Sequence, residues 1–261
     1  RNNAGVYIVA YGDPARECAK RLIRSWDKHM TGIPVCLASD RALDIDILTT
    51  RIQLVIEPEV DIGARSAKTR IYDLAPSSWE YVLYLDADTE LINSIEYLYE
   101  ALVSGWEWLI CKNPQRFHVA RHMERPDNAD ECRETFALWG SDEMMQWNGG
   151  VFAFRRCDNT EEFFRAWHRE WQVYGKRDQG ALLRALWHHP LRSLWLGNEW
   201  NLITRYLPAE QSAGILHHVE EARRWTGRIE ERSDSPQAWE RVRQHIAAGT
   251  TGVTPSTKRT H

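Results

Sequence analysis

Short apolar runs separated by helical patterns constrain the fold of this chain more than any other feature. Four such runs stand at residues 5–11, 34–39, 51–58 and 81–87, and helical patterns precede the second and the fourth. Strands that crossover helices bury on both faces read as near-continuous apolar runs. We therefore predict an α/β fold with a central, mostly parallel sheet flanked by helices.

The first helix shows both a start signal and an apolar stripe. Asp13 is a candidate N-cap, and Pro14 suits the first helical position. Cys18, Leu22 and Trp26 recur at i, i+4 and i+8 and so share one face. This pattern predicts a helix that packs on the sheet through that face.

The second half of the chain indicates a mixed arrangement of strands. Further strand candidates lie at residues 106–112, 149–156, 193–198 and 214–218. A helix between two of them carries the aromatic residues Phe163, Phe164, Trp167 and Trp171. The polar stretch 113–146 is too long for an ordinary connection, and we interpret it as a lid, an acceptor-binding loop or a partly helical cover.

Length and composition favour one main domain. A chain of 261 residues with 43% hydrophobic residues can bury a large core. We expect this domain to span residues 1–228. Residues 229–261 are expected to hold a C-terminal helix that starts at Ser235 and Pro236, followed by a flexible tail.

Charge and cysteine content exclude several classes of protein. The net charge of −4 gives no sequence-wide attraction for nucleic acid. The five cysteines are odd in number and lack a CxxC pair, which argues against a disulfide framework and a structural zinc site. No stretch approaches the ~20 apolar residues of a membrane span, and the start lacks a secretory pattern. We expect a cytoplasmic protein.

The run at residues 81–91, YVLYLDADTEL, places Asp86 and Asp88 at the end of a buried strand. A buried carboxylate is costly unless it is paired or binds a metal. Residues i and i+2 of an extended chain point to the same side, and open parallel sheets bind ligands at their carboxyl ends. The pair can hold Mg²⁺ or Mn²⁺ with a nucleoside diphosphate, or it can simply cap the next helix or face solvent.

Two enzyme classes place DxD after an apolar strand. In haloacid-dehalogenase-type phosphatases the first aspartate is a nucleophile, here Asp86, and the motif continues into Gly-Thr. This chain continues into Thr89 and Glu90 instead. The phosphatase therefore stays a minor alternative to the second class, the metal-dependent glycosyltransferases of the GT-A type.

Several segments, taken in order, carry a more specific resemblance. They are AYGDPARECAKRLIRSW, SAKTRIYDLAP, WNGGVFAFRR, RDQGALLRALW and GILHHVEEARRW, which together with the DxD span roughly residues 5–225. In their order and spacing they resemble family 8 glycosyltransferases, the glycogenin-like group. The resemblance implies one GT-A domain over residues 1–228.

The same resemblance implies a metal site and a diphosphate site. Asp86, Asp88 and His217 match the family's metal ligands, for Mn²⁺ or Mg²⁺. Lys68, and more weakly Arg65, match the position that binds the diphosphate or the transferring sugar. From the residues alone, His217 can equally be a strand-end histidine with a satisfied hydrogen bond, and either cation a solvated loop charge.

Sugar-binding positions follow in the second half of the chain. Asn148, Gly149 and Gly150 resemble the family's donor-sugar segment, where glycine permits close backbone approach. Asp178 and Gln179 match the pair at the far side of the donor sugar, as candidate catalytic residues. A plain turn into the next strand and a helix cap remain the structural alternatives for the glycines and for Asp178.

The nucleotide site has candidates at both ends of the chain. Tyr11, Gly12 and Asp40 lie where the family holds the nucleobase, and Arg223 can replace a lysine that binds diphosphate. Glu220 departs from the family, which has glycine there, and it would repel phosphate unless it turns outward.

The resulting hypothesis is a transferase that moves a sugar from a nucleotide-diphosphate donor, with a UDP-sugar as the expected donor. The resemblance implies retention of the anomeric configuration. The acceptor stays open among glycan, lipid, protein and modified nucleic acid. A second reading is a GT-A domain that binds nucleotide sugars without turnover, because Glu220 spoils the phosphate loop.

Overall fold

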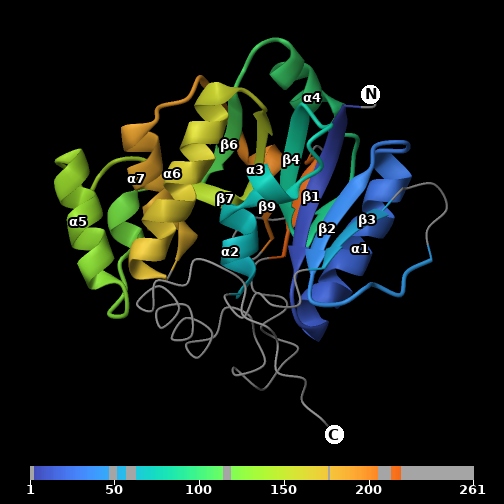
Figure 1. The fold of residues 1–261 in the computed structure, drawn as a ribbon, viewed down its shortest axis with the longest axis horizontal. Coiled ribbons are helices and arrows are strands. Elements are labelled where there is room, and N and C mark those ends of the chain that lie inside the picture. The colour runs from blue at the N-terminus through green and yellow to red at the C-terminus, as the bar shows by residue number, and fades with distance from the viewer. Residues whose placement is uncertain are drawn as a thin grey trace, which may run out of the picture.

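A seven-stranded sheet forms the centre of the molecule (Figure 1). The computed structural model describes residues 3–46, 52–56, 63–113, 119–175, 177–204 and 213–218. The strand order is β3-β2-β1-β4-β7-β6-β8. Neighbouring strands are parallel except where β7 pairs antiparallel with β4 and β6. The mostly parallel α/β sheet predicted from the sequence is confirmed.

The strands coincide with the predicted apolar runs. They are β1 (Ala4–Ala10), β2 (Val35–Ser39), β3 (Ile52–Ile56), β4 (Tyr81–Asp86), β6 (Trp108–Lys112), β7 (Trp147–Arg155) and β8 (Ser193–Leu196). The run predicted from residue 149 begins at Trp147, two residues earlier, because Lys112 of β6 pairs with Trp147. Pairing with β6 therefore extends β7 across the Asn-Gly-Gly segment.

Helices cover both faces of this sheet. They are α1 (Asp13–His29), α2 (Gly63–Thr69), α3 (Ile71–Leu74), α4 (Glu96–Val103), α5 (Ala129–Trp139), α6 (Asp158–Tyr174) and α7 (Asp178–His188), with short 3₁₀ turns η2 (Ala120–Met123) and η3 (Asn198–Trp200). Along β4, Val82 and Tyr84 pack with α2, α6 and α7, whereas Leu83 and Leu85 pack with α1 and α4. Figure 1 shows α5, α6 and α7 grouped on one side and α1 on the other.

The first helix packs as its stripe predicts but begins differently. Cys18, Leu22 and Trp26 are fully buried. The N-cap is Gly12, at φ 82°, so the expected N-cap Asp13 is instead the first helical residue. Glycine tolerates this positive φ, so the turn into the helix falls on Gly12, and the Asp13 carboxylate pairs with Arg16 one helical turn on.

A small second sheet was not predicted from the sequence. It consists of β5 (Thr89–Leu91), β10 (Ile215–His217) and β9 (Leu202–Ile203), in the order β5-β10-β9. His217 lies opposite Thr89 in the antiparallel pair of β5 and β10. This sheet brings a late segment of the chain against the end of β4.

The stretch 113–146 contains helical structure, which is what its interpretation as a partly helical segment predicts. It holds η2 and α5, and Arg184 of α7 anchors α5. The guanidinium of Arg184 lies 3.2 Å from Glu131 Oε1 and donates to Thr135 Oγ1 at 2.8 Å. The helical content is confirmed for the described residues, and the role of the stretch as lid, acceptor-binding loop or cover stays a prediction. The predicted C-terminal helix and tail, residues 229–261, lie outside the described residues.

Candidate metal and nucleotide-sugar site

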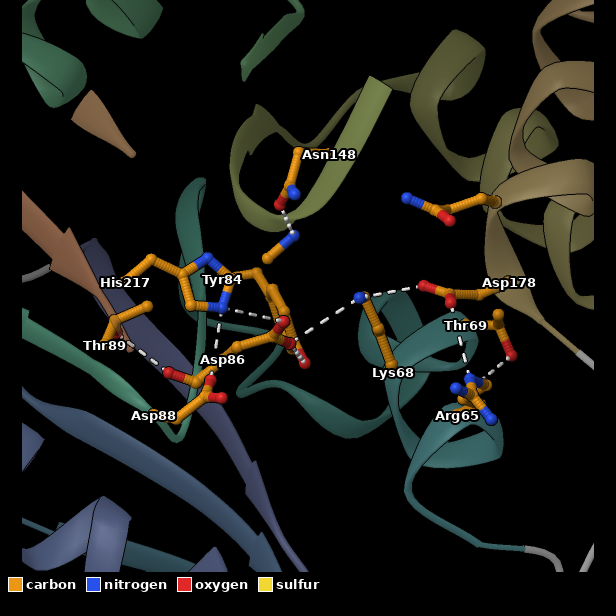
Figure 2. A network of polar contacts seen from close by, with 12 residues as sticks. Arg65, Lys68, Thr69, Tyr84, Asp86, Asp88, Thr89, Asn148, Asp178 and His217 are labelled. Atoms are coloured by element: carbon orange, nitrogen blue, oxygen red, sulfur yellow. Dashed lines mark hydrogen bonds and ion pairs between the residues drawn. The ribbon is translucent and has the colours of Figure 1, made fainter. Parts of the chain in front are cut away.

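Asp86, Asp88 and His217 gather at the carboxyl end of β4 (Figure 2). One potential ligand atom from each lies within 4.8 Å of the others. His217 Nε2 is 3.7 Å from Asp86 Oδ2 and 3.2 Å from Asp88 Oδ1. The turn between β4 and β5 is fixed by Thr89 Oγ1, which donates to the Asp86 carbonyl at 2.8 Å. The predicted triad is thus brought together.

Within this triad, His217 and Asp88 each shift the pKa of the other toward the charged form. Burial alone would lower the pKa of His217, but the charge of Asp88, its hydrogen bond and the charge of Asp86 outweigh it and raise that pKa. Burial would raise the pKa of Asp88, and the charge and hydrogen bond of His217 lower it instead. Two carboxylates and an imidazole form a donor set that fits a divalent metal ion.

Tyr84 holds one oxygen of Asp86 and was missed from the sequence. Its hydroxyl donates to Asp86 Oδ1 at 2.6 Å. Burial, followed by the charge of Asp86, raises the pKa of Tyr84 well above its ordinary value, so the phenol stays a donor. Its position two residues before Asp86 on one strand was the available signal, because such residues share a face.

Lys68 links the metal triad to Asp178 (Figure 2). Its Nζ lies 2.8 Å from Asp178 Oδ2 and 3.6 Å from Asp86 Oδ1. Arg65 Nε, one turn earlier on α2, lies 3.5 Å from Asp178 Oδ1. Burial would raise the pKa of Asp178, but the charges of Lys68 and Arg65 and the Lys68 hydrogen bond lower it to about 2. Asp178 is therefore an anion at neutral pH.

The structure places Asp178 at the first position of α7, where Arg177 is the N-cap. The suggested capping role of Asp178 is therefore wrong, because its carboxylate is held by Lys68. Gln179 follows, and its Nε2 donates to the Trp147 carbonyl at 3.4 Å. Both candidate catalytic residues thus lie beside the start of β7.

The Asn-Gly-Gly segment touches both halves of the site. A Cβ on Gly150 would lie 2.3 Å from His217 Cε1 and 2.8 Å from Asp86 Oδ2. A Cβ on Gly149 would lie 3.1 Å from Lys68 Nζ and 3.3 Å from Asp178 Oδ2. The glycines permit close approach, as expected, and the groups that approach here are side chains of the protein itself.

The nucleobase candidates also meet at this edge of the sheet. The Gly12 amide donates to Asp40 Oδ1 at 3.1 Å, and Arg16 forms an ion pair with the same carboxylate. Tyr11 is buried, 7% exposed. Arg16 was not singled out from the sequence. Arg223 lies outside the described residues, so its assignment stays a prediction.

Among the comparisons with known proteins, the one with solved structures finds similar proteins. No family model matches the chain, and no curated protein sequence matches it. Among solved structures, mouse xyloside xylosyltransferase 1 in its apo form is similar, with a TM-score of 0.56 at 13% identity. The alignment covers 83% of this chain and 97% of that one.

This similarity bears on the fold. It confirms the predicted GT-A-like glycosyltransferase fold, without being specific for family 8. Among the residues that the structure describes, no helix has both the length and the apolar character needed to cross a membrane. The chain therefore combines a GT-A-like fold with an Asp-Asp-His cluster at the carboxyl edge of its sheet.

Proposed function

We propose that the chain is a metal-dependent glycosyltransferase that moves a sugar from a nucleoside-diphosphate donor, with a UDP-sugar as the expected donor, to an acceptor. The observation that carries the proposal is the convergence of Asp86, Asp88 and His217 beside the Lys68–Asp178 ion pair. The GT-A-like fold supports it, because ligands of open α/β sheets bind at this edge.

The three ligands fit a divalent cation by their chemistry and spacing. When bound, Mn²⁺ or Mg²⁺ would supply charge stabilisation to a departing diphosphate. The absence of a side chain on Gly150 lets His217 and Asp86 pack directly against its backbone, since a Cβ there would be 2.3 Å from the imidazole. The case for a divalent cation therefore rests on Asp86, Asp88 and His217 taken together.

The ionised groups beside the metal triad suit the two charges that develop in glycosyl transfer. Lys68 provides a fixed ammonium for the anionic leaving group, and preorganised charge of this kind is commonly the largest catalytic contribution. Asp178, with a pKa of about 2, cannot serve as a proton donor at neutral pH. Its carboxylate suits stabilisation of a cationic sugar, as expected for a retaining transferase.

Calorimetric titration of UDP with and without Mn²⁺ tests the proposal. We expect the wild type to bind UDP tightly only when Mn²⁺ is present. Asp88→Asn and His217→Asn should bind UDP weakly, with or without Mn²⁺. The matched control is His218→Asn, because the His218 imidazole lies 3.2 Å from Glu90 rather than with the carboxylates of the triad. UDP binding that ignores Mn²⁺ would contradict the metal site.

A panel of UDP-sugars then separates the alternatives. Metal-dependent hydrolysis or transfer supports the enzyme, whereas tight binding without turnover identifies a nucleotide-sugar-binding protein. The phosphatase alternative requires a covalent phosphate on Asp86, which trapping and mass spectrometry would detect. No such adduct is expected, because the motif continues into Thr89 and Glu90 rather than into Gly-Thr.

A further inference from the structure

A chain of asparagine side chains leads from the end of β6 to the candidate metal ligand. Asn148 Nδ2 donates to Asn113 Oδ1 at 2.9 Å, and Asn201 Nδ2 donates to Asn148 Oδ1 at 2.9 Å. Asn201 Oδ1 lies 2.8 Å from His217 Nδ1. Figure 2 shows Asn148 and His217 at the same site. None of the contacts is local in sequence, so the chain joins four separate segments.

Backbone chemistry fixes the direction of this chain. The Gly150 amide, which can only donate, lies 2.8 Å from Asn148 Oδ1. That atom is therefore the amide oxygen, and the Asn201 atom that meets it must be the donor nitrogen. The remaining polar atom of Asn201 is its oxygen, which faces His217. An amide oxygen only accepts, so His217 Nδ1 carries the proton.

We propose that Asn201 is a positioning residue that accepts a hydrogen bond from His217 Nδ1–H and so keeps Nε2, the nitrogen that would bind a metal, turned toward Asp86 and Asp88. A metal-binding histidine commonly donates its other ring N–H to a partner that fixes tautomer and ring orientation. The arrangement is buried: His217 is 3% exposed and Asn201 5%. This inference deepens the proposed function and rests on its metal site.

The chain also gives Asn148 a task besides contact with the donor sugar. Its Oδ1 already accepts from Gly150 and Asn201, and its Nδ2 donates to Asn113. The backbone of Asn113 is fixed in turn, since its backbone N–H donates to the backbone carbonyl of Gln146 at 3.0 Å. Asn148 therefore orients Asn201, and through it the imidazole.

The first test reads the protonation of His217 Nδ1 in the protein without metal. ¹⁵N NMR of histidine-labelled wild type is expected to show a protonated Nδ1 for His217, because Nδ1 faces Asn201 Oδ1, whether or not Nε2 carries a second proton opposite Asp88. His217→Asn identifies the signals. In Asn201→Ala we expect Nδ1 to lose its proton in part of the molecules. A wild-type His217 whose Nδ1 carries no proton would overturn the inference.

The second test reads Mn²⁺ affinity without nucleotide, by calorimetry or electron paramagnetic resonance. Asn201→Ala should weaken binding by about 10–100-fold, the usual effect of losing such a partner. Asn201→Asp keeps an acceptor for Nδ1–H but loses the donor to Asn148 Oδ1, so it should bind Mn²⁺ more tightly than Asn201→Ala and more weakly than wild type. The matched control is Asn198→Ala on η3, expected to bind as wild type.

The outcomes separate this inference from the proposed function. Asn201→Ala that binds Mn²⁺ within twofold of wild type would overturn the positioning role and leave the metal site intact. Wild-type protein that binds no Mn²⁺ would overturn the metal site and the proposed function, while the NMR measurement still decides how Asn201 holds His217. Should Asn201→Ala fail to fold, Asn201→Asp and the Nδ1 proton of wild-type His217 carry the test.

Discussion

Lys68 Nζ and Asp178 Oδ2 lie 2.8 Å apart and join α2 to α7 across the site, with side chains only 9% and 11% exposed. Breaking a buried ion pair leaves one charge without compensation. We expect Lys68→Met and Asp178→Asn each to lower the free energy of unfolding by roughly 3 kcal/mol. The double variant should lose less than the sum by at least about 1 kcal/mol.

Urea unfolding of the four proteins measures this coupling. The control is Lys20→Met, because Lys20 and Glu17 form a pair of similar length on the surface, 2.7 Å, with exposures of 21% and 53%. We expect that change to cost less than about 1 kcal/mol. Strict additivity at Lys68 and Asp178 would show that the two residues do not stabilise each other.

Gly150→Ala should disrupt the metal site more than Gly149→Ala. The added Cβ at position 150 meets the His217 ring at 2.3 Å, whereas at position 149 it meets the flexible end of Lys68 at 3.1 Å. We expect Mn²⁺ affinity to fall by more than about tenfold in the first variant and to change little in the second. Equal affinities, measured by calorimetry, would count against the close packing around His217.

His168 should make the protein less stable in acid. Burial, helped by the charge of Arg70, lowers the pKa of His168 from 6.5 to about 4. Between these values the unfolded chain binds a proton that the folded protein does not, so stability falls as pH decreases through this window. The loss attributable to His168 is about 2 kcal/mol between pH 8 and pH 5.

This pH dependence is measured against a variant. His168→Gln should flatten the stability profile between pH 8 and pH 5, while His188→Gln, at a side chain that is 49% exposed, should leave it as in wild type. Parallel profiles for wild type and His168→Gln would contradict the assignment.

Thiol labelling should distinguish Cys157 from the other cysteines. Cys18, Cys36, Cys111 and Cys132 are buried and Cys157 is partly exposed. Burial raises the pKa of Cys36 and Cys132 to about 12, which leaves little reactive thiolate at neutral pH. We expect one fast-reacting thiol in native protein and none in Cys157→Ala. Several fast thiols would indicate a more open core.

The sequence predicts what local patterns determine. The runs that became β1, β2 and β4 are apolar because these strands are buried on both faces, and such a run can be recognised in the sequence alone. Asp86 and Asp88 were found because charge at the end of such a run is unusual. His217, Lys68 and Asp178 came from the resemblance, and the structure brings them to the same edge.

What sequence could not reveal depends on contacts between distant segments. Strands β5 and β9 have three and two residues, too few for a periodic pattern, and the predicted strand at residues 214–218 gave no sign that β10 would pair with them in a second sheet. Asn113 and Asn201 follow no motif, and their value comes from neighbours far along the chain. The capping role suggested for Asp178 failed for the same reason, since its partner Lys68 belongs to another helix.

Because β7 runs opposite to β6, the segment that connects the two strands lies beside the site and is a place where the sequence can vary. Because β6 and β7 are antiparallel neighbours, the segment between Lys112 and Trp147 leaves and re-enters the sheet at the edge that carries the metal triad. Exposed positions between η2 and α5 lie outside the strands, so changes there leave the pairing of β6 with β7 in place. Selection could therefore vary what enters beside Asp178 while the residues at the end of β4 stay fixed.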